Sequence, residues 1–413
     1  MQEALPVFDN NMNQTKPRIL HVIPTLGSGG AERVLLTYLS QPALKQSFQH
    51  LVVLTEVPDP HSDRPETFLV KLLEEQGVKV IGLGFLGSSN VLTRARSLCN
   101  IIRNNEINLV HTHLLWANIA GRIAGRWSGV PVLSTFHNSD YDAQVIASVR
   151  APAWKQDLIR RLDGWTARNF VVKSIAVSQY VAHHIKLKLG INPNDIEVVY
   201  NPIDMRQVKT SGTESRSKIL QEIGLSDQSK LIVSVGRVTD QKGVIELVEA
   251  FAKIAKSNAL VHLAVIGNTV SDRVYFNKVM ERIEFHGIQE RVHLIGPRYD
   301  VAAWLASADL FAFPSKYEGM GIALAEAMAA GVACIASDVG PIPELINSGQ
   351  TGVLYTLNDI DALAHAIKRL LTDDELRKKL GENGQKSILE KFDPANKSQE
   401  MADLYRQTIM LFK

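Results

Sequence analysis

The sequence predicts an α/β protein made of two doubly wound domains, each with a parallel sheet covered by helices on both faces. Short apolar runs alternate with helical stretches along most of the chain, and this alternation is typical of repeated βαβ units. The length of 413 residues favours two hydrophobic cores over one. A polar stretch, residues 206–229, separates two such arrays and is interpreted as a linker with a short helix at Arg216–Ile223.

The composition is that of an ordinary globular protein, with 45% hydrophobic and 21% charged residues. A formal net charge of +2 implies no broad field for nucleic acid. Cys99 and Cys334 lie far apart in apolar contexts, which argues against a disulfide framework or a cysteine metal site. No apolar run reaches the roughly 18 residues of a membrane span, and no secretion signal is recognisable. We therefore expect a cytoplasmic protein with a flexible tail over residues 1–16.

The first domain is predicted over residues 17–205. A strand at Arg18–Pro24 leads into a loop with Gly29 and Gly30, and a helix follows over Ala31–Leu39. Such a unit brings backbone N–H groups close to an anion or a sugar, although the same loop can be a tight turn only. Further strands are expected at Leu51–Thr55, Val78–Leu83, Leu109–His113, Val132–His137, Ile175–Ser178 and Ile196–Tyr200. Helices are expected at Glu66–Gln76, Thr93–Asn104, Trp116–Trp127, Trp154–Asn169 and Tyr180–Leu189.

Two histidines fall at the carboxyl ends of predicted strands, where ligands bind in sheets of this type. His113 is as well explained by a strand-end histidine bonded to the backbone as by a substrate contact. For His137 we favour a functional role, because Asn138 after it continues into a long polar loop. His113, Asn138 and Trp154 are our candidates for contacts with an acceptor.

The helix Trp154–Asn169 carries basic residues beside two tryptophans. This pattern suits an anionic membrane surface or an anionic acceptor. A helix that packs its aromatic residues on the sheet and solvates its charges explains the pattern at least as well. The residues concerned are Trp154, Lys155, Arg160, Arg161, Trp165 and Arg168.

The second domain is predicted over residues 230–390. A strand ends at Gly236 and a helix begins after Gly243, with Arg237 and Lys242 between them. Two cations at a strand end and a helix N-terminus are well placed for a diphosphate, and the flanking glycines favour this over two solvated loop cations. Gly267 and Arg298 follow the next two strands, Val261–Gly267 and Val292–Gly296, and are candidates for the wall of a base pocket.

The stretch from Pro314 to Ile346 organises the second domain. A strand at Asp309–Pro314 leads into a glycine-rich turn, Glu318–Gly321, and an alanine-rich helix follows from Ile322 to Ala330. Gly331 is expected to end this helix, and another strand follows at Val332–Ala336. Glu318 in the turn and Glu326 in the helix bracket a helix N-terminus that suits a nucleotide.

Glu318 and Glu326, separated by seven residues within PSKYEGMGIALAEAMAAGVACIAS, resemble the E-x7-E signature of family 4 glycosyltransferases. The resemblance covers most of the chain and includes the Gly29-Gly30 loop, His137, the Gly236–Gly243 segment and Asp338–Ile346. It implies the GT-B fold, in which two Rossmann-like domains face each other across a cleft. It also fits a final helix, residues 391–413, that returns to the first domain. The sequence departs from the pattern at Met320, where Phe is common, and at Pro341, where a glycine is frequent.

The resemblance implies roles for the matched positions. Arg237 and Lys242 would bind the donor diphosphate, Glu326 the ribose and Glu318 the transferring sugar. His137 would lie near that sugar. The catalytic candidates are therefore Glu318, His137, Arg237 and Lys242. The donor-binding candidates are Gly29, Gly30, Gly236, Arg237, Lys242, Gly267, Arg298, Glu318, Gly319, Met320, Gly321, Ile322 and Glu326.

The implied reaction is transfer of a sugar from a nucleotide-sugar, UDP-linked in most of the family, to a hydroxyl of a saccharide or lipid-linked acceptor, with retention of configuration. Cell-surface polysaccharide or glycolipid synthesis is the expected setting. Because Arg237 and Lys242 supply positive charge, we expect no metal and no cofactor.

Three alternatives stay open. A metal-dependent transferase would use an Asp-x-Asp triplet, and two occur, Asp140–Asp142 and Asp359–Asp361. A sugar-nucleotide epimerase or a phosphorylase could share the architecture, and a non-catalytic nucleotide-sugar-binding subunit could share the site. The E-x7-E stretch argues against an epimerase or phosphorylase, and the complete set of cations and carboxylates argues against a non-catalytic subunit.

Overall fold

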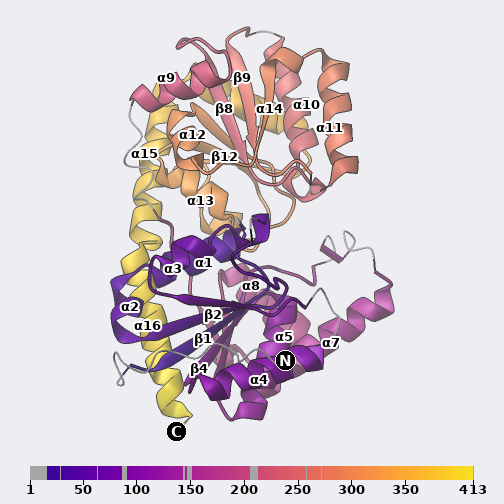
Figure 1. The fold of residues 1–413 in the computed structure, drawn as a ribbon. Helices are drawn as coiled ribbons and strands as arrows, with labels where there is room; N and C mark the ends of the chain where they lie inside the picture. The colour runs from indigo at the N-terminus through magenta and orange to yellow at the C-terminus, as the bar shows by residue number, and fades with distance from the viewer. Residues whose placement is uncertain are drawn as a thin grey trace. The chain divides into compact units, whose positions relative to one another are not determined.

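The computed structural model describes residues 16–27, 29–62, 64–85, 91–142, 145–146, 151–204, 213–256, 258–270 and 272–412. The chain forms two compact units (Figure 1). The first unit contains residues 1–202 and 394–413, and the second contains residues 203–393. None of the helices in the described ranges is both long and apolar enough to cross a membrane.

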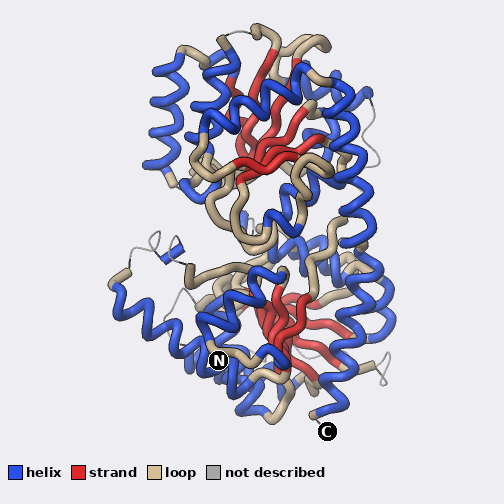
Figure 2. Tube along the Cα trace, turned by 180° about the vertical axis from the view of Figure 1, so that it is seen from behind, coloured by secondary structure: helices blue, strands red, loops and turns tan. Residues whose placement is uncertain are grey.

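The first unit contains a seven-stranded parallel sheet in the order β3-β2-β1-β4-β5-β6-β7. Helices lie on both faces of it (Figure 2). One cluster of buried apolar side chains packs on each face. The strands are β1 Arg18–Ile23, β2 Gln49–Leu54, β3 Lys79–Gly82, β4 Leu109–His113, β5 Val132–Phe136, β6 Lys173–Ala176 and β7 Ile196–Val198. The helices are α1 Gly30–Leu39, α2 Pro42–Ser47, α3 Val70–Glu74, α4 Val91–Asn104, α5 Leu115–Ser128, α7 Ala153–Phe170, α8 Gln179–Leu189 and α16 Pro394–Leu411.

The second unit contains a six-stranded parallel sheet in the order β10-β9-β8-β11-β12-β13. The strands are β8 Lys230–Val235, β9 Val261–Ile266, β10 Val292–Gly296, β11 Leu310–Phe313, β12 Ala333–Ser337 and β13 Val353–Tyr355. The helices are α9 Thr213–Glu222, α10 Val244–Ala255, α11 Arg273–His286, α12 Val301–Ser307, α13 Ile322–Ala329, α14 Ile360–Thr372 and α15 Asp374–Lys391.

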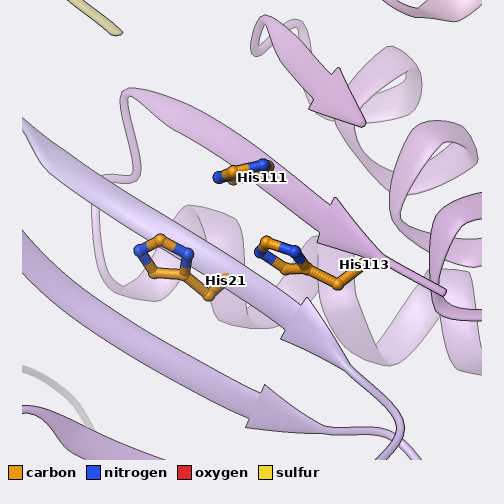
Figure 3. Close-up of side chains that lie close together, drawn as sticks. All are labelled: His21, His111 and His113. Carbon is orange, nitrogen blue, oxygen red and sulfur yellow. The ribbon is translucent and has the colours of Figure 1, made fainter. Parts of the chain in front are cut away.

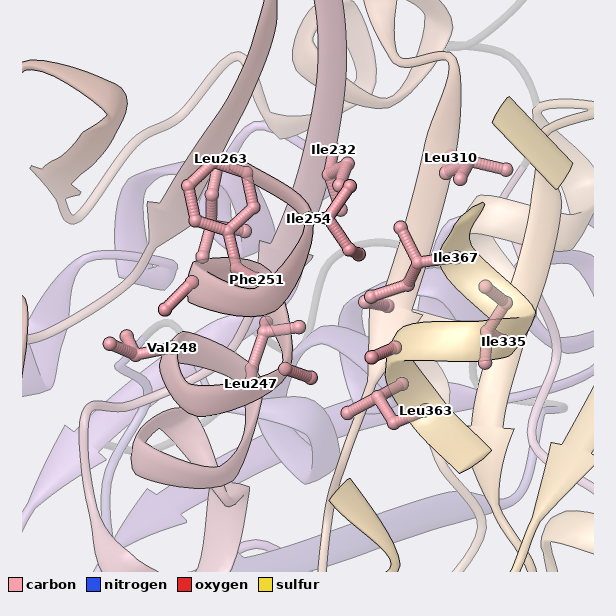
Figure 4. Close-up of a cluster of buried hydrophobic side chains, with 14 of the residues drawn as sticks. Ile232, Leu247, Val248, Phe251, Ile254, Leu263, Leu310, Ile335, Leu363 and Ile367 are labelled. Atoms are coloured by element: carbon pink, nitrogen blue, oxygen red, sulfur yellow. The ribbon is translucent and has the colours of Figure 1, made fainter. Parts of the chain in front are cut away.

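The core of the second unit shows why its strands read as unbroken apolar runs. Phe251 on α10 and Ile367 on α14 pack onto the same face of the sheet, against strand residues such as Ile232 and Leu310 (Figure 4). Strands covered on both faces need apolar side chains in both directions. Each fully buried side chain of this size contributes about 1.5–3 kcal/mol of transfer free energy.

Both sheets follow one rule of strand order. In each, the first three strands run outward from the middle to one edge, and the later strands add on the other side of the first. The order therefore reverses between β1 and β4 in the first unit, and between β8 and β11 in the second. This arrangement is the doubly wound one, and the predicted fold class of two Rossmann-like domains is confirmed.

The region predicted as a linker, residues 206–229, is the main difference in domain organisation. Residues 205–212 lie outside the described residues, but α9 packs against α12 of the second unit. Arg216 on α9 donates to the carbonyl oxygen of Ser229 and to the carboxylate of Asp309, both at 2.9 Å. Residues 213–229 are thus part of the second unit, because a buried helix face and an ion pair attach them to it.

Other differences are local. The predicted helix Glu66–Gln76 is a 3₁₀ turn at Pro65–Thr67 followed by the shorter α3, and α2, α11 and β13 were not predicted.

The C-terminal helix α16 packs on α2 and β4 of the first unit, where the hydroxyl of Tyr405 lies 2.6 Å from Nδ1 of His111. Almost all of the predicted tail, residues 1–15, lies outside the described residues.

Candidate functional site

The carboxyl ends of β8 and β11 meet where the strand order of the second sheet reverses. The two strands pair directly, with Leu310 opposite Ile232 and Phe311 opposite Val233. The chain leaves β8 through residues 236–243 into α10, and it leaves β11 through residues 314–321 into α13. Doubly wound sheets bind ligands at such a point. These two loops carry Arg237, Lys242 and Glu318.

Lys242 and Glu318 form an ion pair that joins the two loops. Nζ of Lys242 lies 2.5 Å from Oε1 of Glu318, and the two side chains are only 18% and 10% exposed. The ammonium also lies 5.3 Å from the centre of the Phe313 ring, within range of a cation–π attraction. Lys242 lines a pocket together with residues that include Gly236 and Ser315. The site therefore holds a partly dehydrated cation whose charge is balanced by one carboxylate.

Glycines allow the loops of this site to approach each other. Gly267 has a φ of +147°, and a Cβ on it would collide with the carbonyl oxygen of Gly236. Gly243 has a φ of +62°, and a Cβ there would collide with the carbonyl oxygen of Pro314. Both positions therefore exclude a side chain through conformation and through space. At Gly236 itself, the aliphatic part of Lys242 lies against the position where a Cβ would stand.

Arg237 is exposed, in contrast to Lys242. Its Nη2 donates to Oε1 of Gln241 at 3.3 Å, and Nε2 of Gln241 donates to the carbonyl oxygen of Tyr317 at 3.0 Å. The backbone N–H of Lys316 donates to the carbonyl oxygen of Gln241 at 2.8 Å. Gln241 thus connects the loop after β8 to the loop after β11, while the guanidinium of Arg237 faces solvent at the edge of the site.

The structure places Glu318 in the loop and Glu326 in α13, as predicted. Gly321, with a φ of +88°, precedes the helix, and Gly331, with a φ of +79°, follows it. The N–H groups of Gly331 and Val332 donate to the carbonyls of Met328 and Ala327, which is a Schellman cap. Among the other predicted donor residues of this stretch, Gly319 and Met320 are buried, and Ile322 and Glu326 are partly exposed.

Arg298 is engaged in a way that the sequence did not indicate. Its guanidinium lies 2.7 Å from Glu222 on α9 and 2.8 Å from Asp300, and it stacks over the Trp304 ring at 5.7 Å. The hydrogen bond to Asp300 raises the pKa of Arg298 above its ordinary value. This arginine ties α9 to the start of α12, so a nucleotide base would have to compete with two carboxylates for it.

In the first unit, Gly29 precedes α1 and Gly30 is its first residue. Gly29 has an ordinary φ of −70° and offers no side chain to cap the helix. The atoms nearest to a Cβ on Gly29 would be those of the Glu32 carboxylate. This is the end of a flexible side chain, and it also accepts a hydrogen bond from Thr25 at 3.1 Å. Backbone conformation therefore does not require glycine here. Ser28 lies outside the described residues.

His113 and His137 are brought together at the ends of β4 and β5. Nδ1 of His113 lies 3.1 Å from Nε2 of His137, and both side chains are buried. Burial lowers the pKa of His137 to about 4, and burial together with His137 lowers the pKa of His113 well below its ordinary value. Both imidazoles are therefore neutral near pH 7. They can donate and accept hydrogen bonds, but they supply no positive charge.

The loop that begins at His137 is anchored at its start. Asn138 is exposed, but Tyr141 is buried and its hydroxyl donates to Asp163 of α7 at 2.9 Å. Asp163 also forms a buried ion pair with Arg122 at 2.5 Å. Trp154, the third predicted acceptor residue, is 70% exposed at the start of α7.

Sequence reasoning missed that three more histidines share the sheet face of His113. They are His21 on β1, His50 on β2 and His111 on β4. Figure 3 shows His21 and His111 beside His113. The signal was present, because His111 and His113 are two apart in a strand and must point to the same face. One nitrogen each of His21, His111 and His113 lies within 4.8 Å of the others.

Three clustered imidazoles raise the question of a transition metal. Both nitrogens of His111 are already engaged. Nδ1 lies 2.6 Å from the Tyr405 hydroxyl, and Nε2 lies 2.7 Å from the Thr135 hydroxyl. A metal ion held by three histidines would have to break one of these bonds, so the donor set does not fit such an ion as it stands.

Comparison with known proteins places both units. Residues 28–207 match the family described as Glycosyltransferase Family 4, and residues 215–387 match the family described as Glycosyl transferases group 1. The chain is 29% identical to the alpha-maltose-1-phosphate synthase of Mycolicibacterium smegmatis, over 78% of this chain and 84% of that protein. It is 28% identical to the UDP-Gal:alpha-D-GlcNAc-diphosphoundecaprenol alpha-1,3-galactosyltransferase of Escherichia coli, over 75% of this chain and 78% of that protein.

A solved structure supports the same fold. The Anabaena protein Alr3699/HepE, in complex with UDP and glucose, superposes with a TM-score of 0.80 at 23% sequence identity. The match covers 95% of this chain and 100% of that one.

Proposed function

Because this chain belongs to the family 4 glycosyltransferases of the GT-B fold, enzymes that act on nucleotide-sugars, we propose that it transfers a sugar from a UDP-linked donor to a hydroxyl of a saccharide or lipid-linked acceptor. The observation that carries the proposal is the Lys242–Glu318 ion pair where the strand order of the second sheet reverses. Polysaccharide or glycolipid synthesis is the setting we propose, since the Escherichia coli relative is named for a diphosphoundecaprenol-linked acceptor.

The donor diphosphate would replace Glu318 as the partner of Lys242. The ammonium of Lys242 is held at a strand end by Glu318 and by the Phe313 ring, so it needs little reorganisation to meet a phosphate. Arg237 at the exposed edge would add the second cation. When Lys242 turns to the diphosphate, the Glu318 carboxylate loses its partner and becomes available to accept hydrogen bonds from the sugar hydroxyls.

The chemistry that this arrangement serves is the departure of a nucleoside diphosphate. As the anomeric C–O bond breaks, negative charge grows on the diphosphate and positive charge grows on the sugar ring. Lys242 and Arg237 would stabilise the first charge, a role that a divalent metal fills elsewhere, and we propose that no metal is needed. The Glu318 carboxylate would lie near the second charge.

We propose retention of configuration by attack from the same face. The acceptor oxygen forms the new bond to the anomeric carbon beside the departing phosphate, and its proton passes to a phosphate oxygen, so that charge and atoms balance without a covalent enzyme intermediate. Glu326 on α13 would hold the ribose hydroxyls. Gly29, Gly30 and His137 in the first unit would contact the diphosphate and the sugar.

A panel of nucleotide-sugars tests this function. Purified enzyme is given each donor with saccharide acceptors, and release of the nucleoside diphosphate and the anomeric configuration of the product are measured. We expect release with a UDP-sugar that depends on the acceptor, and an axial or equatorial linkage that matches the donor. Binding of a donor with no release under any acceptor would favour a non-catalytic binding subunit, and a changed sugar without transfer would favour an epimerase.

The exposed stripe of α7 supports a second part of the proposal, contact with the inner membrane face. Trp154, Leu158 and Trp165 are 70%, 59% and 49% exposed, and their spacing places them on one side of the helix. Arg161 lies between them in the same row and is exposed. Tryptophan and leucine beside basic residues suit the interface of an anionic bilayer.

Co-sedimentation with lipid vesicles tests this contact. Wild type should sediment with vesicles that contain anionic lipid and much less with zwitterionic ones, because Lys155, Arg160, Arg161 and Arg168 outnumber the single exposed acid of the helix, Asp157. Replacing Trp154 and Trp165 by Ala should abolish binding, whereas Trp127→Ala, at a tryptophan on α5 that is 47% exposed, should not. No binding of wild type to anionic vesicles would refute the contact.

A further inference from the structure

Four buried histidines form a row across the sheet of the first unit and lead toward His137. His50 stands on β2, His21 on β1 and His113 on β4, and His137 follows β5. Burial lowers the pKa of each of them, to about 4 for His50 and His137. Each ring is therefore neutral near pH 7, with a proton on one nitrogen and none on the other, which is called bare below and can only accept a hydrogen bond. The positions of the four protons decide what His137 presents to a ligand.

A backbone carbonyl fixes the first two protons. Nε2 of His50 lies 3.3 Å from the carbonyl oxygen of Leu44, which can only accept, so this nitrogen carries the proton. Nδ1 of His50 is therefore bare, and it lies 3.0 Å from Nε2 of His21. The proton of that second bond must come from His21. It follows that Nδ1 of His21 is bare, and this nitrogen is buried with no hydrogen-bond partner among the described residues.

The ring of His113 faces this bare nitrogen. Nε2 of His113 is, like Nδ1 of His21, a buried imidazole nitrogen without a hydrogen-bond partner among the described residues. The two rings belong to one cluster, and Figure 3 shows a nitrogen of each directed toward the other. A proton on Nε2 of His113 is attracted by the lone pair of His21, whereas a second lone pair there would be repelled. In a dry interior such a difference is not screened by water. Nε2 of His113 therefore carries the proton and its Nδ1 is bare.

We propose that His113, with His21 and His50 behind it, is a positioning residue that fixes the tautomer and orientation of His137. Since Nδ1 of His113 is bare, the 3.1 Å bond to His137 takes its proton from Nε2 of His137. His137 is left with a bare Nδ1, which has no partner among the described residues, on a side chain that is 9% exposed. Every proton in the row points inward, from His137 toward the carbonyl of Leu44.

The effect of this His137 tautomer on the reaction rests on the proposed function, sugar transfer. His137 presents a hydrogen-bond acceptor, so it suits a hydroxyl of the transferring sugar and does not suit a phosphate. A neutral acceptor at this place would orient the sugar without adding positive charge beside it. Loss of the orienting bond leaves His137 free to rotate. Bonds that orient metal-bound histidines are typically worth about 10–100-fold in affinity or activity, and we expect an effect at the lower end of that range here.

Nitrogen NMR of the intact enzyme, labelled with ¹⁵N-histidine, tests the row without reference to activity. The chain has 12 histidines, and His137→Gln identifies the signals of His137. We expect His137 to be protonated at Nε2 near pH 7, with a ring proton protected from exchange with water. A His137 ring that is protonated at Nδ1 in the wild type would overturn the proposal, whether or not the enzyme transfers sugar.

Variants of His113 distinguish a role in positioning His137 from a role in packing alone. His113→Phe removes the acceptor and should abolish exchange protection of the His137 proton and lower kcat roughly tenfold, with donor affinity unchanged within about twofold. His113→Asn, whose side-chain oxygen can accept in place of Nδ1, should retain both. The control Thr135→Val removes a bond of His111 only and should leave the His137 signals as in wild type. A protected His137 proton and a wild-type kcat in His113→Phe would refute the role. If that variant does not fold, the wild-type and His113→Asn spectra still decide.

Discussion

The two units place different chemistry at the same point of the same fold. In each sheet the strand order reverses beside the first strand, and candidate ligand residues follow the strands there. In the second unit these residues include an ion pair, Lys242 with Glu318, and an exposed Arg237. In the first unit, the neutral imidazoles of His113 and His137 stand at the ends of β4 and β5, and glycines stand at the start of α1.

The difference follows from what surrounds each group. At Lys242, a carboxylate and an aromatic face take the place of the water that burial removes from the ammonium. The first-unit histidines have no carboxylate in their row and bond mainly to one another, so burial keeps them neutral. A charged site suits a leaving diphosphate, and a neutral hydrogen-bonding site suits a sugar. The following predictions test whether this division holds.

The largest expected effect is that of Glu318→Gln on the rate of sugar transfer. Loss of this carboxylate should lower kcat by about 10²–10³-fold, because charge stabilisation near the reacting sugar is lost. The affinity for UDP should not fall, because the diphosphate takes the place of this carboxylate beside Lys242. The comparison of steady-state rates with calorimetric UDP affinities checks this. Asp361→Asn, which removes the exposed partner of Lys253 in the same unit, is the control and should change neither. Equal losses of transfer and UDP affinity in Glu318→Gln would contradict the role in catalysis.

The glycines of the two sites should differ in what they contribute to stability. Gly267→Ala should lower the free energy of unfolding by about 3 kcal/mol, because φ is +147° and the new Cβ collides with the backbone of Gly236. Gly29→Ala should cost less than about 1 kcal/mol, since φ is ordinary and only the Glu32 side chain must move.

Urea denaturation measures both variants. Gly296→Ala is a control for backbone conformation alone, because φ is +80° there but nothing lies within 4 Å of the new Cβ. Gly267→Ala that is no less stable than Gly296→Ala would show that the close approach of the loops does not matter.

Acid should destabilise the first unit more than the site region of the second. The folded pKa values of His50 and His137 are about 4, below the 6.5 of an unfolded chain, so the unfolded state binds more protons between these values. Stability is therefore fully present above about pH 6.5 and falls as the pH is lowered toward about 4. Hydrogen exchange at about pH 7 and pH 5 should show a greater loss of protection in β1 and β4 than in β8 and β11. Equal losses would mean that the histidine row is not the acid-sensitive element.

The smallest expected effect is that of a chelator. If the cations of the second unit replace a metal, EDTA should leave the rate of transfer unchanged within experimental error. The assay is run with and without added Mg²⁺ or Mn²⁺, and a known metal-dependent transferase serves as the positive control. Loss of activity that returns with either ion would favour the alternative based on an Asp-x-Asp triplet.

Much of this architecture could be predicted from the sequence because its signals are local. Apolar runs, glycine turns and the alanine-rich α13 can each be recognised from residues that are neighbours in the sequence. Both sheets were predicted to be parallel, and they are. The position of Glu318 before the helix and Glu326 within it came from the same local pattern. Helix α11, with exposed Val274, Met280 and Phe285, lacks a clean apolar face and was missed.

The contacts that depend on distant segments could not be predicted. The Lys242–Glu318 pair, the engagement of Arg298 by Glu222 and the histidine row each join residues that are far apart in the chain. Their partners are set by strand order, which a single sequence does not specify. The linker prediction was wrong for the same reason, since α9 is attached to the second unit by residues that are distant in the sequence, such as Asp309 and Arg298.

The most direct test of the central claim is the affinity of Lys242→Met for UDP, measured by titration calorimetry beside wild type and Lys253→Met. Lys253 lies on α10, the helix that follows Lys242, and pairs with the exposed Asp361. Wild type and Lys253→Met should bind UDP equally. Lys242→Met should bind it about 10–100-fold more weakly, because a charged hydrogen bond is lost and Glu318 is left unpaired. Unchanged affinity in Lys242→Met would contradict the assignment of this ion pair as the diphosphate site.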